Sequence, residues 1–443
     1  REERRPRACC SSSRCLSHSS SLSLFSLSSS TTSSDTSFNP SSSSSPLPSS
    51  LPTKMDTVLM AASLKREAES AENGATDESG SRPQELERAL SFARPTPVAV
   101  EVLPDEPRFA HLRHKQRFAV DIGGTLVKLV YSTVSESDNK KLLLVFQKFH
   151  SIEECIHFLK GEWRNRDAEC FLNGTGGGAY KYAELLEKEL GVKVHRTDEM
   201  RSLIVGCDYL LRHVEDESFT YHHEAAGRNR YQYKPIDPEA VYPFLLVNIG
   251  TGISILKVDS PTAFTRVGGS TMGGGAFIGL GNLVTSATTF DELLNLAERG
   301  DHRKVDSLVC DIYGGGYEQL GLPPDIIAGS FGKCSHHNKR KNQNAPATHS
   351  EEDVAKSLLL MISNNIGQMA ILYGNRYKLT RIYFGGFFIR QHWIAMRTLS
   401  FAINFWSQGE SEALFMKHEG YLGAVGSFLD NLEASSPPQN GHM

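Results

Sequence analysis

Two glycines between two apolar runs constrain this chain more than any other feature. Residues 118–130 read FAVDIGGTLVKLV, which is typical of a β-strand, a tight turn and an antiparallel return strand. Because Gly123 and Gly124 lack β-carbons, their backbone N–H groups can approach a phosphate closely, and Thr125 and Lys128 add a hydroxyl and a positive charge. Asp121 ends the first run and could hold Mg²⁺ directly or through water. An ordinary β-hairpin would show the same pattern.

The same pattern returns in the second half of the chain. Residues 244–256 read FLLVNIGTGISIL, with Asn248 in place of the Asp and the turn Gly250-Thr251-Gly252. Neither turn fits GxxxxGK[ST] or GxGxxG, so the folds built on those loops are not implied. Two glycine hairpins, each followed by strands and helices, indicate a duplicated α/β chain. We therefore expect an actin-like fold of two lobes, as in sugar kinases and heat-shock ATPases, with ATP in the cleft.

Further glycine runs precede predicted helices. Gly273, Gly274 and Gly275 stand at the start of a helix expected over 276–286, where backbone N–H groups and the helix N-terminus favour a phosphate. Residues 174–178 read GTGGG between a strand and a helix, which suits an anionic ligand or a flexible connection equally. Arg266 offers a fork for a carboxylate, or is an exposed charge on a strand.

Glu199 lies in the first turn of a helix that Thr197 can cap and that we expect to continue to about His213. Acidic residues in a first turn commonly complement the helix dipole. Alternatively, a carboxylate held there at the edge of a cleft can accept a proton from a substrate hydroxyl. The pattern alone leaves both interpretations open.

Composition narrows the classes of function. The 443 residues are 39% hydrophobic and 22% charged, which is typical of a globular protein. The net charge of −4 gives no cationic field for nucleic acid, and no apolar run approaches the length of a membrane span. Eight cysteines occur without a CxxC pair, which favours reduced thiols over disulfides or a zinc site. A small molecule is the expected partner.

The chain divides by composition into tails and a folded body. Residues 1–54 are Ser-rich and predicted to be disordered, either as an organelle transit peptide or as translated upstream sequence, since the first methionine is Met55. Residues 55–116 are predicted to be a mostly disordered linker with a possible short helix at 83–92. The body comprises an N-terminal lobe at 117–245, whose polar residues 215–243 lead to the other half, a C-terminal lobe at 246–431 with a long helix from 351, and a loose tail at 432–443.

Several runs together resemble the eukaryotic-type (type II) pantothenate kinases, in a monofunctional form like that of plants. The resemblance covers about 117–429 and depends on the runs DIGGTLVK at 121–128, NIGTGIS at 248–254, GGGAF at 273–277, DIYGG at 311–315 and HEGYLGAVG at 418–426.

The resemblance implies ATP- and Mg²⁺-dependent phosphorylation of pantothenate, the first committed step toward coenzyme A, in an actin-like homodimer in the cytoplasm, or in a plastid or mitochondrion if 1–54 is a transit peptide. It assigns the catalytic carboxylate to Glu199 and ATP binding to the runs at 121–128 and 273–277. It assigns pantothenate and the inhibitors acetyl-CoA or CoA to Thr251, Ser254 and Arg266. A kinase of another small hydroxylated substrate, or a catalytically silent sensor of ATP or acyl-CoA, remains an alternative.

Overall fold

A computed structural model of the chain describes residues 97–135, 141–162, 171–222, 227–334, 349–430 and 432. The Ser-rich segment 1–54, the possible helix at 83–92 and residues 433–443 of the tail lie outside the described residues.

The first sheet contains the first glycine hairpin and has the order β1-β4-β3-β2-β5-β6. β2, β3 and β4 run antiparallel to one another, and β5 and β6 continue parallel to β2. Asp121 pairs with Lys128 across the hairpin, as its sequence predicts. The strands are β1 (Ala99–Val102), β2 (Phe118–Ile122), β3 (Val127–Val134), β4 (Leu142–Phe149), β5 (Phe171–Thr175) and β6 (Lys193–Arg196).

The second sheet repeats this arrangement, with the order β11-β10-β9-β14-β15-β7-β8. β9, β10 and β11 form the antiparallel part, and β14 and β15 continue parallel to β9. A meander followed by two parallel strands, present twice, is the duplicated actin-like topology expected from the two hairpins. The strands are β7 (Ser218–Tyr221), β8 (Tyr231–Tyr233), β9 (Phe244–Ile249), β10 (Ile253–Val258), β11 (Phe264–Ser270), β14 (Arg381–Gly385) and β15 (Glu412–Met416).

Helices cover both faces of each sheet, and alternating side chains determine what each face packs against. Phe118 and Val120 of β2 pack with α3 and α5, whereas Ala119 joins a core made with α6 and α12. Leu246 of β9 belongs to that same core, while Leu245 packs on the other face with α8, α10 and α11. The helices are α3 (Ile152–Glu162), α4 (Gly177–Lys181), α5 (Ala183–Leu190), α6 (Glu199–His213), α7 (Gly274–Val284), α8 (Phe290–Arg299), α10 (Glu351–Tyr377), α11 (Trp393–Trp406) and α12 (Leu422–Leu429).

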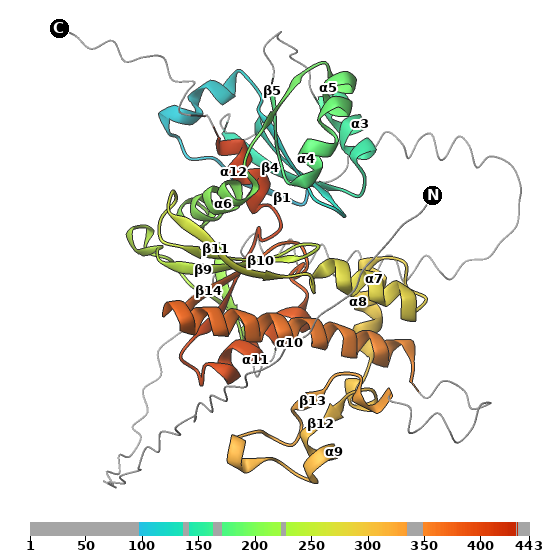
Figure 1. Cartoon of the computed structure of the whole chain (residues 1–443). Helices are drawn as coiled ribbons and strands as arrows, with labels where there is room; N and C mark the ends of the chain where they lie inside the picture. The colour runs from blue at the N-terminus through green and yellow to red at the C-terminus, as the bar shows by residue number, and fades with distance from the viewer. Residues whose placement is uncertain are drawn as a thin grey trace, which may run out of the picture. The chain divides into compact units, whose positions relative to one another are not determined.

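α6 and α12 pack against each other between the two sheets, as Figure 1 shows. Two glycines permit this approach: a β-carbon on Gly206 would lie 1.9 Å from the carbonyl oxygen of Leu422, and one on Gly426 would lie 1.8 Å from that of Ser202. Any other residue at either position would force the helices apart. This packing fixes the relative positions of the two loops that precede α6 and α12.

Three features of the fold differ from the sequence interpretation. The range 55–116 was expected to be mostly linker, but its described end forms β1 at the edge of the first sheet and a 3₁₀ helix, Pro107–Arg113, whose Phe109 and Leu112 are buried. β7 and β8 were assigned to the N-terminal lobe, but they extend the second sheet beside β15. α12 was assigned to the C-terminal lobe, but it packs on β2, β3 and β5 of the first. Long-range pairing determines all three, and local periodicity does not encode it.

Two stretches form short helical pieces. Residues 177–190 form two helices, α4 and α5, that meet at Tyr182. Residues 302–313 form a 3₁₀ turn (His302–Lys304) followed by the short β12 (Ser307–Leu308) and α9 (Val309–Tyr313).

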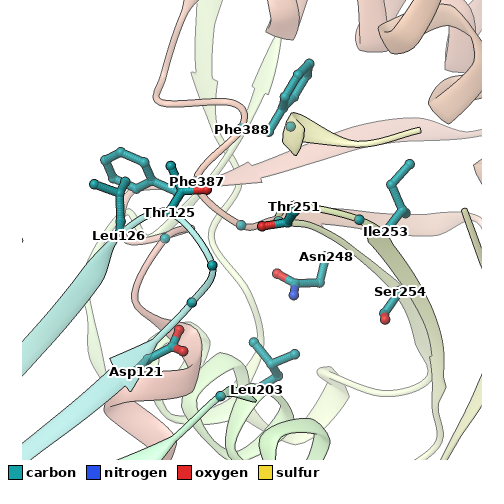
Figure 2. A pocket seen from close by; sticks show the side chains of 18 of the residues that line it. Asp121, Thr125, Leu126, Leu203, Asn248, Thr251, Ile253, Ser254, Phe387 and Phe388 are labelled. Atoms are coloured by element: carbon teal, nitrogen blue, oxygen red, sulfur yellow. The ribbon is translucent and has the colours of Figure 1, made fainter. Parts of the chain in front are cut away.

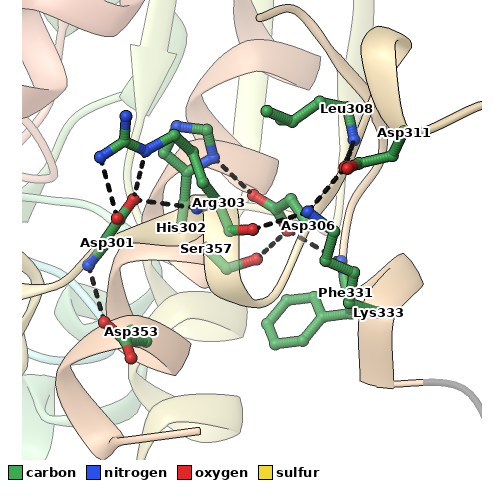
Figure 3. A network of polar contacts seen from close by, with 10 residues as sticks. All are labelled: Asp301, His302, Arg303, Asp306, Leu308, Asp311, Phe331, Lys333, Asp353 and Ser357. Atoms are coloured by element: carbon green, nitrogen blue, oxygen red, sulfur yellow. Dashed lines mark hydrogen bonds and ion pairs between the residues drawn. The ribbon is translucent and has the colours of Figure 1, made fainter. Parts of the chain in front are cut away.

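A polar network fixes the segment that carries β12, α9 and β13 (Ile327–Gly329) to the long helix α10 (Figure 3). Its centre is Asp306, a fully buried carboxylate that accepts hydrogen bonds from the Phe331 N–H at 2.8 Å and from the hydroxyl of Ser357 on α10. His302 Nδ1 lies 3.1 Å from its other oxygen. Asp353 of α10 likewise accepts from the Asp301 N–H at 2.8 Å.

Candidate active site

The two glycine turns meet at one cavity of about 430 Å³, a size typical of small-molecule sites. The first turn is closed by a hydrogen bond from the Gly123 N–H to the Leu126 carbonyl (3.1 Å), and the second by one from the Gly250 N–H to the Gly252 carbonyl (2.9 Å). Figure 2 shows Asp121 and Thr125 of the first hairpin and Asn248 and Thr251 of the second around the same space. The cavity is lined by most of the residues that the sequence selected: Asp121, Gly123, Gly124, Thr125, Lys128, Glu199, Gly250, Thr251, Gly252, Ser254, Arg266 and Gly274.

The glycine triplet before α7 has a structural role that its sequence did not predict. The N–H of Gly274 donates to the Gly250 carbonyl, and that of Gly275 donates to the Thr251 carbonyl, both at 2.9 Å. A β-carbon on Gly273 would lie 2.8 Å from the Thr251 oxygen. The triplet therefore lets α7 begin directly against the second turn. Of the three, only Gly274 lines the cavity, and the amides of Gly274 and Gly275 are occupied by the turn.

The Asp121 carboxylate, at the end of β2, is closely surrounded by other groups. It lies 3.3 Å from Lys128 Nζ, and both side chains are 14% exposed. A β-carbon on Gly176 would lie 2.7 Å from the carboxylate, and one on Gly423, in the first turn of α12, would lie 3.0 Å from it. A single carboxylate beside a glycine turn suits Mg²⁺, which keeps waters and phosphate oxygens as its other ligands.

Glu199 is the first residue of α6 and reaches the same cavity. The N-cap is Asp198, whose carboxylate accepts from the Arg201 N–H at 2.8 Å, so the expectation of Thr197 as the cap was wrong. Thr197 is instead buried and hydrogen-bonds the Ser427 hydroxyl of α12 at 3.0 Å. Burial and the negative charge of Asp121 raise the pKa of Glu199, while Lys128 opposes this. A carboxylate with a raised pKa is better suited to accept a proton near neutral pH.

Ser254 on β10 and Arg266 on the adjacent strand β11 line the cavity. Arg266 Nε donates to Ser254 Oγ at 3.3 Å. The guanidinium is exposed to the cavity, and the described residues include no carboxylate that pairs with it. The hydroxyl thus orients a positive charge that is available to an anionic ligand.

One wall of the cavity was not predicted as part of the site. It comprises the segment 386–391 after β14, Phe290 at the start of α8, and Glu419 between β15 and α12. Glu419 lies in the run 418–426 that carries the resemblance, but nothing in the sequence assigned a role to it or to Arg390, because their neighbours in space are distant in the chain.

Comparisons with known proteins identify the family of this chain. Residues 117–430 match the family model described as Fumble. The chain belongs to the Fumble family. This confirms the resemblance to type II pantothenate kinases, and the matched residues include every strand of both sheets except β1.

Individual relatives of this Fumble-family chain differ in length. "Pantothenate kinase 1" of Arabidopsis thaliana is 43% identical, with 73% of this chain and 86% of the relative covered. "4'-phosphopantetheine phosphatase" of Mus musculus is 44% identical, with 76% of this chain but 43% of the relative covered. The chain therefore spans less than half the length of the mouse protein.

A solved structure with a similar fold is the activator of the 2-hydroxyisocaproyl-CoA dehydratase from Clostridium difficile. It is 13% identical, covers 72% of this chain and 95% of its own, and gives a TM-score of 0.40.

No helix within the described ranges combines the length and apolar character that crossing a bilayer requires.

Proposed function

We propose that this chain phosphorylates pantothenate to 4'-phosphopantothenate with ATP, in the first committed step of coenzyme A biosynthesis. The observation that carries the proposal is the meeting of two glycine turns, an acidic first helical residue and an arginine in one cavity of a Fumble-family chain. Relatives of similar identity are named pantothenate kinases, among them the Arabidopsis protein.

In the proposed reaction the γ-phosphoryl group passes in line to the primary hydroxyl of pantothenate. Such a transfer depends on positioning and charge neutralisation more than on covalent chemistry by the protein. Backbone N–H groups of the two turns, other than those of Gly123 and Gly250 that close them, would bind phosphate oxygens, and Lys128 would offset their charge. Mg²⁺, held through Asp121, would supply further neutralisation of the phosphates. Glu199 would orient and deprotonate the hydroxyl, and Arg266 with Ser254 would hold the carboxylate of pantothenate.

The proposal also covers inhibition of the enzyme and its oligomeric state. We propose that acetyl-CoA or CoA inhibits the enzyme by occupying Thr251, Ser254 and Arg266, which also bind substrate. We further propose a homodimer that acts in the cytoplasm. The domain boundaries at 54, 116, 245 and 431 remain predictions. β7, β8 and α12 pack in the opposite lobe from the one that these boundaries assign.

The deciding experiment incubates the full chain with ATP, Mg²⁺ and, in parallel, pantothenate, glucose and glycerol, and identifies products by mass. The proposal expects one added phosphoryl group on pantothenate alone. Phosphorylation of a sugar instead would assign the chain to another small-molecule kinase. ATP binding with no phosphorylated product would indicate a silent sensor.

A further inference from the structure

Glu419 is a buried carboxyl group that the proposed reaction does not use. It lines the cavity, and the residue is only 6% exposed. Burial raises the pKa of Glu419 to about 8, so ionising this carboxyl group costs free energy. A carboxyl group in such a place is expected to make contacts that a smaller or apolar residue could not make.

Glu419 contacts the segment 386–391, which follows β14. Its Oε1 accepts a hydrogen bond from the Gln391 N–H at 3.1 Å, and its backbone carbonyl accepts from the Gly386 N–H at 2.7 Å. The Gln391 side chain donates in return to the Lys417 carbonyl at 2.9 Å. These three bonds connect both ends of segment 386–391 to residues 417–419.

The segment requires such a restraint because of its backbone conformation. Arg390 and Gln391 have φ values of +48° and +52°, two consecutive left-handed residues of which neither is glycine. L-residues adopt this region singly and at a cost, so surrounding contacts must maintain it.

The conformation determines where the wall of the cavity stands. It places the Arg390 guanidinium 4.2 Å from the ring centroid of Phe290 and 4.6 Å from that of Phe387, and lets it pair with Asp291. Phe387, Phe388 and Arg390 then all line the cavity. If Gln391 relaxed to an ordinary conformation, this aromatic and cationic wall would move.

We propose that Glu419 is a positioning residue for nucleotide binding: by accepting the Gln391 N–H, it maintains the left-handed pair at 390–391 and so the wall from Phe387 to Arg390. The inference depends on the proposed function, because it takes the ligand against this wall to be ATP. Glu419 acts through the segment and not on the reacting atoms, so its removal weakens ATP binding and leaves pantothenate binding unchanged.

The test measures equilibrium binding of ATP by calorimetry to the full chain and to three variants. Loss of one such hydrogen bond predicts about tenfold weaker ATP binding in Glu419→Ala. Glu419→Gln keeps an acceptor oxygen and should bind ATP within about threefold of the unchanged chain. Adding Gln391→Gly to Glu419→Ala should restore most of the affinity, because glycine adopts positive φ without strain. The KM for pantothenate should change less than about twofold throughout, since Glu419 acts on the nucleotide side.

Glu412→Ala is the matched control, because Glu412 lies on β15 and pairs with Lys234 at the surface. The positioning role is overturned if Glu419→Ala binds ATP normally, or if neither Glu419→Gln nor the added Gln391→Gly restores binding. If Glu419→Ala does not fold, as judged by circular dichroism, the comparison of Glu419→Gln with Glu419→Met decides, since methionine is of similar length but offers no oxygen acceptor and should weaken ATP binding. Failure of the unchanged chain to bind ATP would instead overturn the proposed function.

Discussion

Gly124 and Thr251 face each other across the cavity, one from each glycine turn: a β-carbon on Gly124 would lie 3.1 Å from Thr251 Oγ1. The two halves of the duplicated chain therefore approach each other closely at the turns, where a phosphate chain is proposed to bind. Asp121 of the first half corresponds to Asn248 of the second, so the two similar hairpins differ in charge at this position. One side offers a metal ligand, and the other an uncharged amide.

Substituting Gly124 by Ala should push the turns apart. Overpacking typically costs about 1–3 kcal/mol, which corresponds to about a 5- to 150-fold loss of ATP affinity. Because the conflict is with the Thr251 side chain, Gly124→Ala and Thr251→Ala should not be additive in a double-mutant cycle of ATP binding. Gly161→Ala on α3 is the control, since a β-carbon there meets nothing within 4 Å. Strict additivity would show that the two turns act independently.

Glu199→Gln should separate the two interpretations of this first-turn acid. As a general base, Glu199 contributes about 10²–10⁴-fold to turnover, so kcat should fall by that factor while ATP binding and thermal stability stay close to normal. Glu184→Gln is the matched control, since Glu184 occupies the first turn of α5 away from the cavity. Equal, small effects of both changes on kcat would assign Glu199 to the helix dipole alone.

The acid limb of the pH profile should report Glu199. A general base must be deprotonated, so kcat/KM should rise with pH through the pKa of Glu199, which burial and Asp121 raise above the ordinary value of 4.5. Lys128 lowers that pKa, so Lys128→Met should move the acid limb to higher pH as well as weaken ATP binding. Lys160→Met on α3, a surface pair with Glu189, is the control. If the acid limb of kcat/KM does not shift in Lys128→Met, a group other than Glu199 determines that limb.

Asp306→Ala should destabilise the chain without reaching the cavity. The change leaves the Phe331 N–H and the Ser357 hydroxyl buried without their acceptor, and each such unsatisfied buried group costs about 1–3 kcal/mol. Urea unfolding should show a lower midpoint with an unchanged m-value. Asp259→Ala removes an exposed pair with Lys257 and should cost about 0.2–1 kcal/mol. A similar loss in both variants would show that the Figure 3 network contributes little.

The buried pair of His418 and Glu217 should make stability depend on pH. Burial disfavours the imidazolium, but Glu217 at 2.7 Å, with Glu101 at 3.7 Å, outweighs it, and the pKa of His418 lies above its ordinary value of 6.5. A raised pKa in the folded state gives stabilisation that is complete below the unfolded value and is lost as pH rises through the folded one. Lys417, which lowers this pKa, reduces the effect without reversing it.

Glu217→Gln should consequently lower the urea midpoint more at pH 6 than at pH 9. The comparison needs the unchanged chain and the variant at both pH values, because Glu217 also accepts a hydrogen bond from the backbone N–H of His418 at 3.0 Å, and an amide oxygen in its place can still accept that bond. The same loss at both pH values would mean that His418 is neutral when folded.

The sequence predicted those parts of the site that depend on local pattern. Gly123 and Gly124 require a tight turn wherever they occur between apolar runs, and Glu199 follows directly from a helix start, so both were placed correctly. Glu419 and Arg390 were missed because their role depends on a hydrogen bond to Gln391 that links segments 28 residues apart. The glycine triplet at 273–275 illustrates an intermediate case. Its helix was predicted, but the same small residues that suit a phosphate also suit a close backbone contact, and for Gly274 and Gly275 the structure shows the contact.

The order of the strands has a consequence for how this chain folds during translation. β7 enters the second sheet by pairing with β15, where Phe219 lies opposite Phe415, and α6 covers one face of the first sheet without its partner helix until α12 is present. On the ribosome, neither half can acquire its full core before nearly all of the described chain has emerged. Apolar faces such as that of α6 would remain uncovered during translation, and the nascent chain is expected to need chaperone protection until its last helix is made.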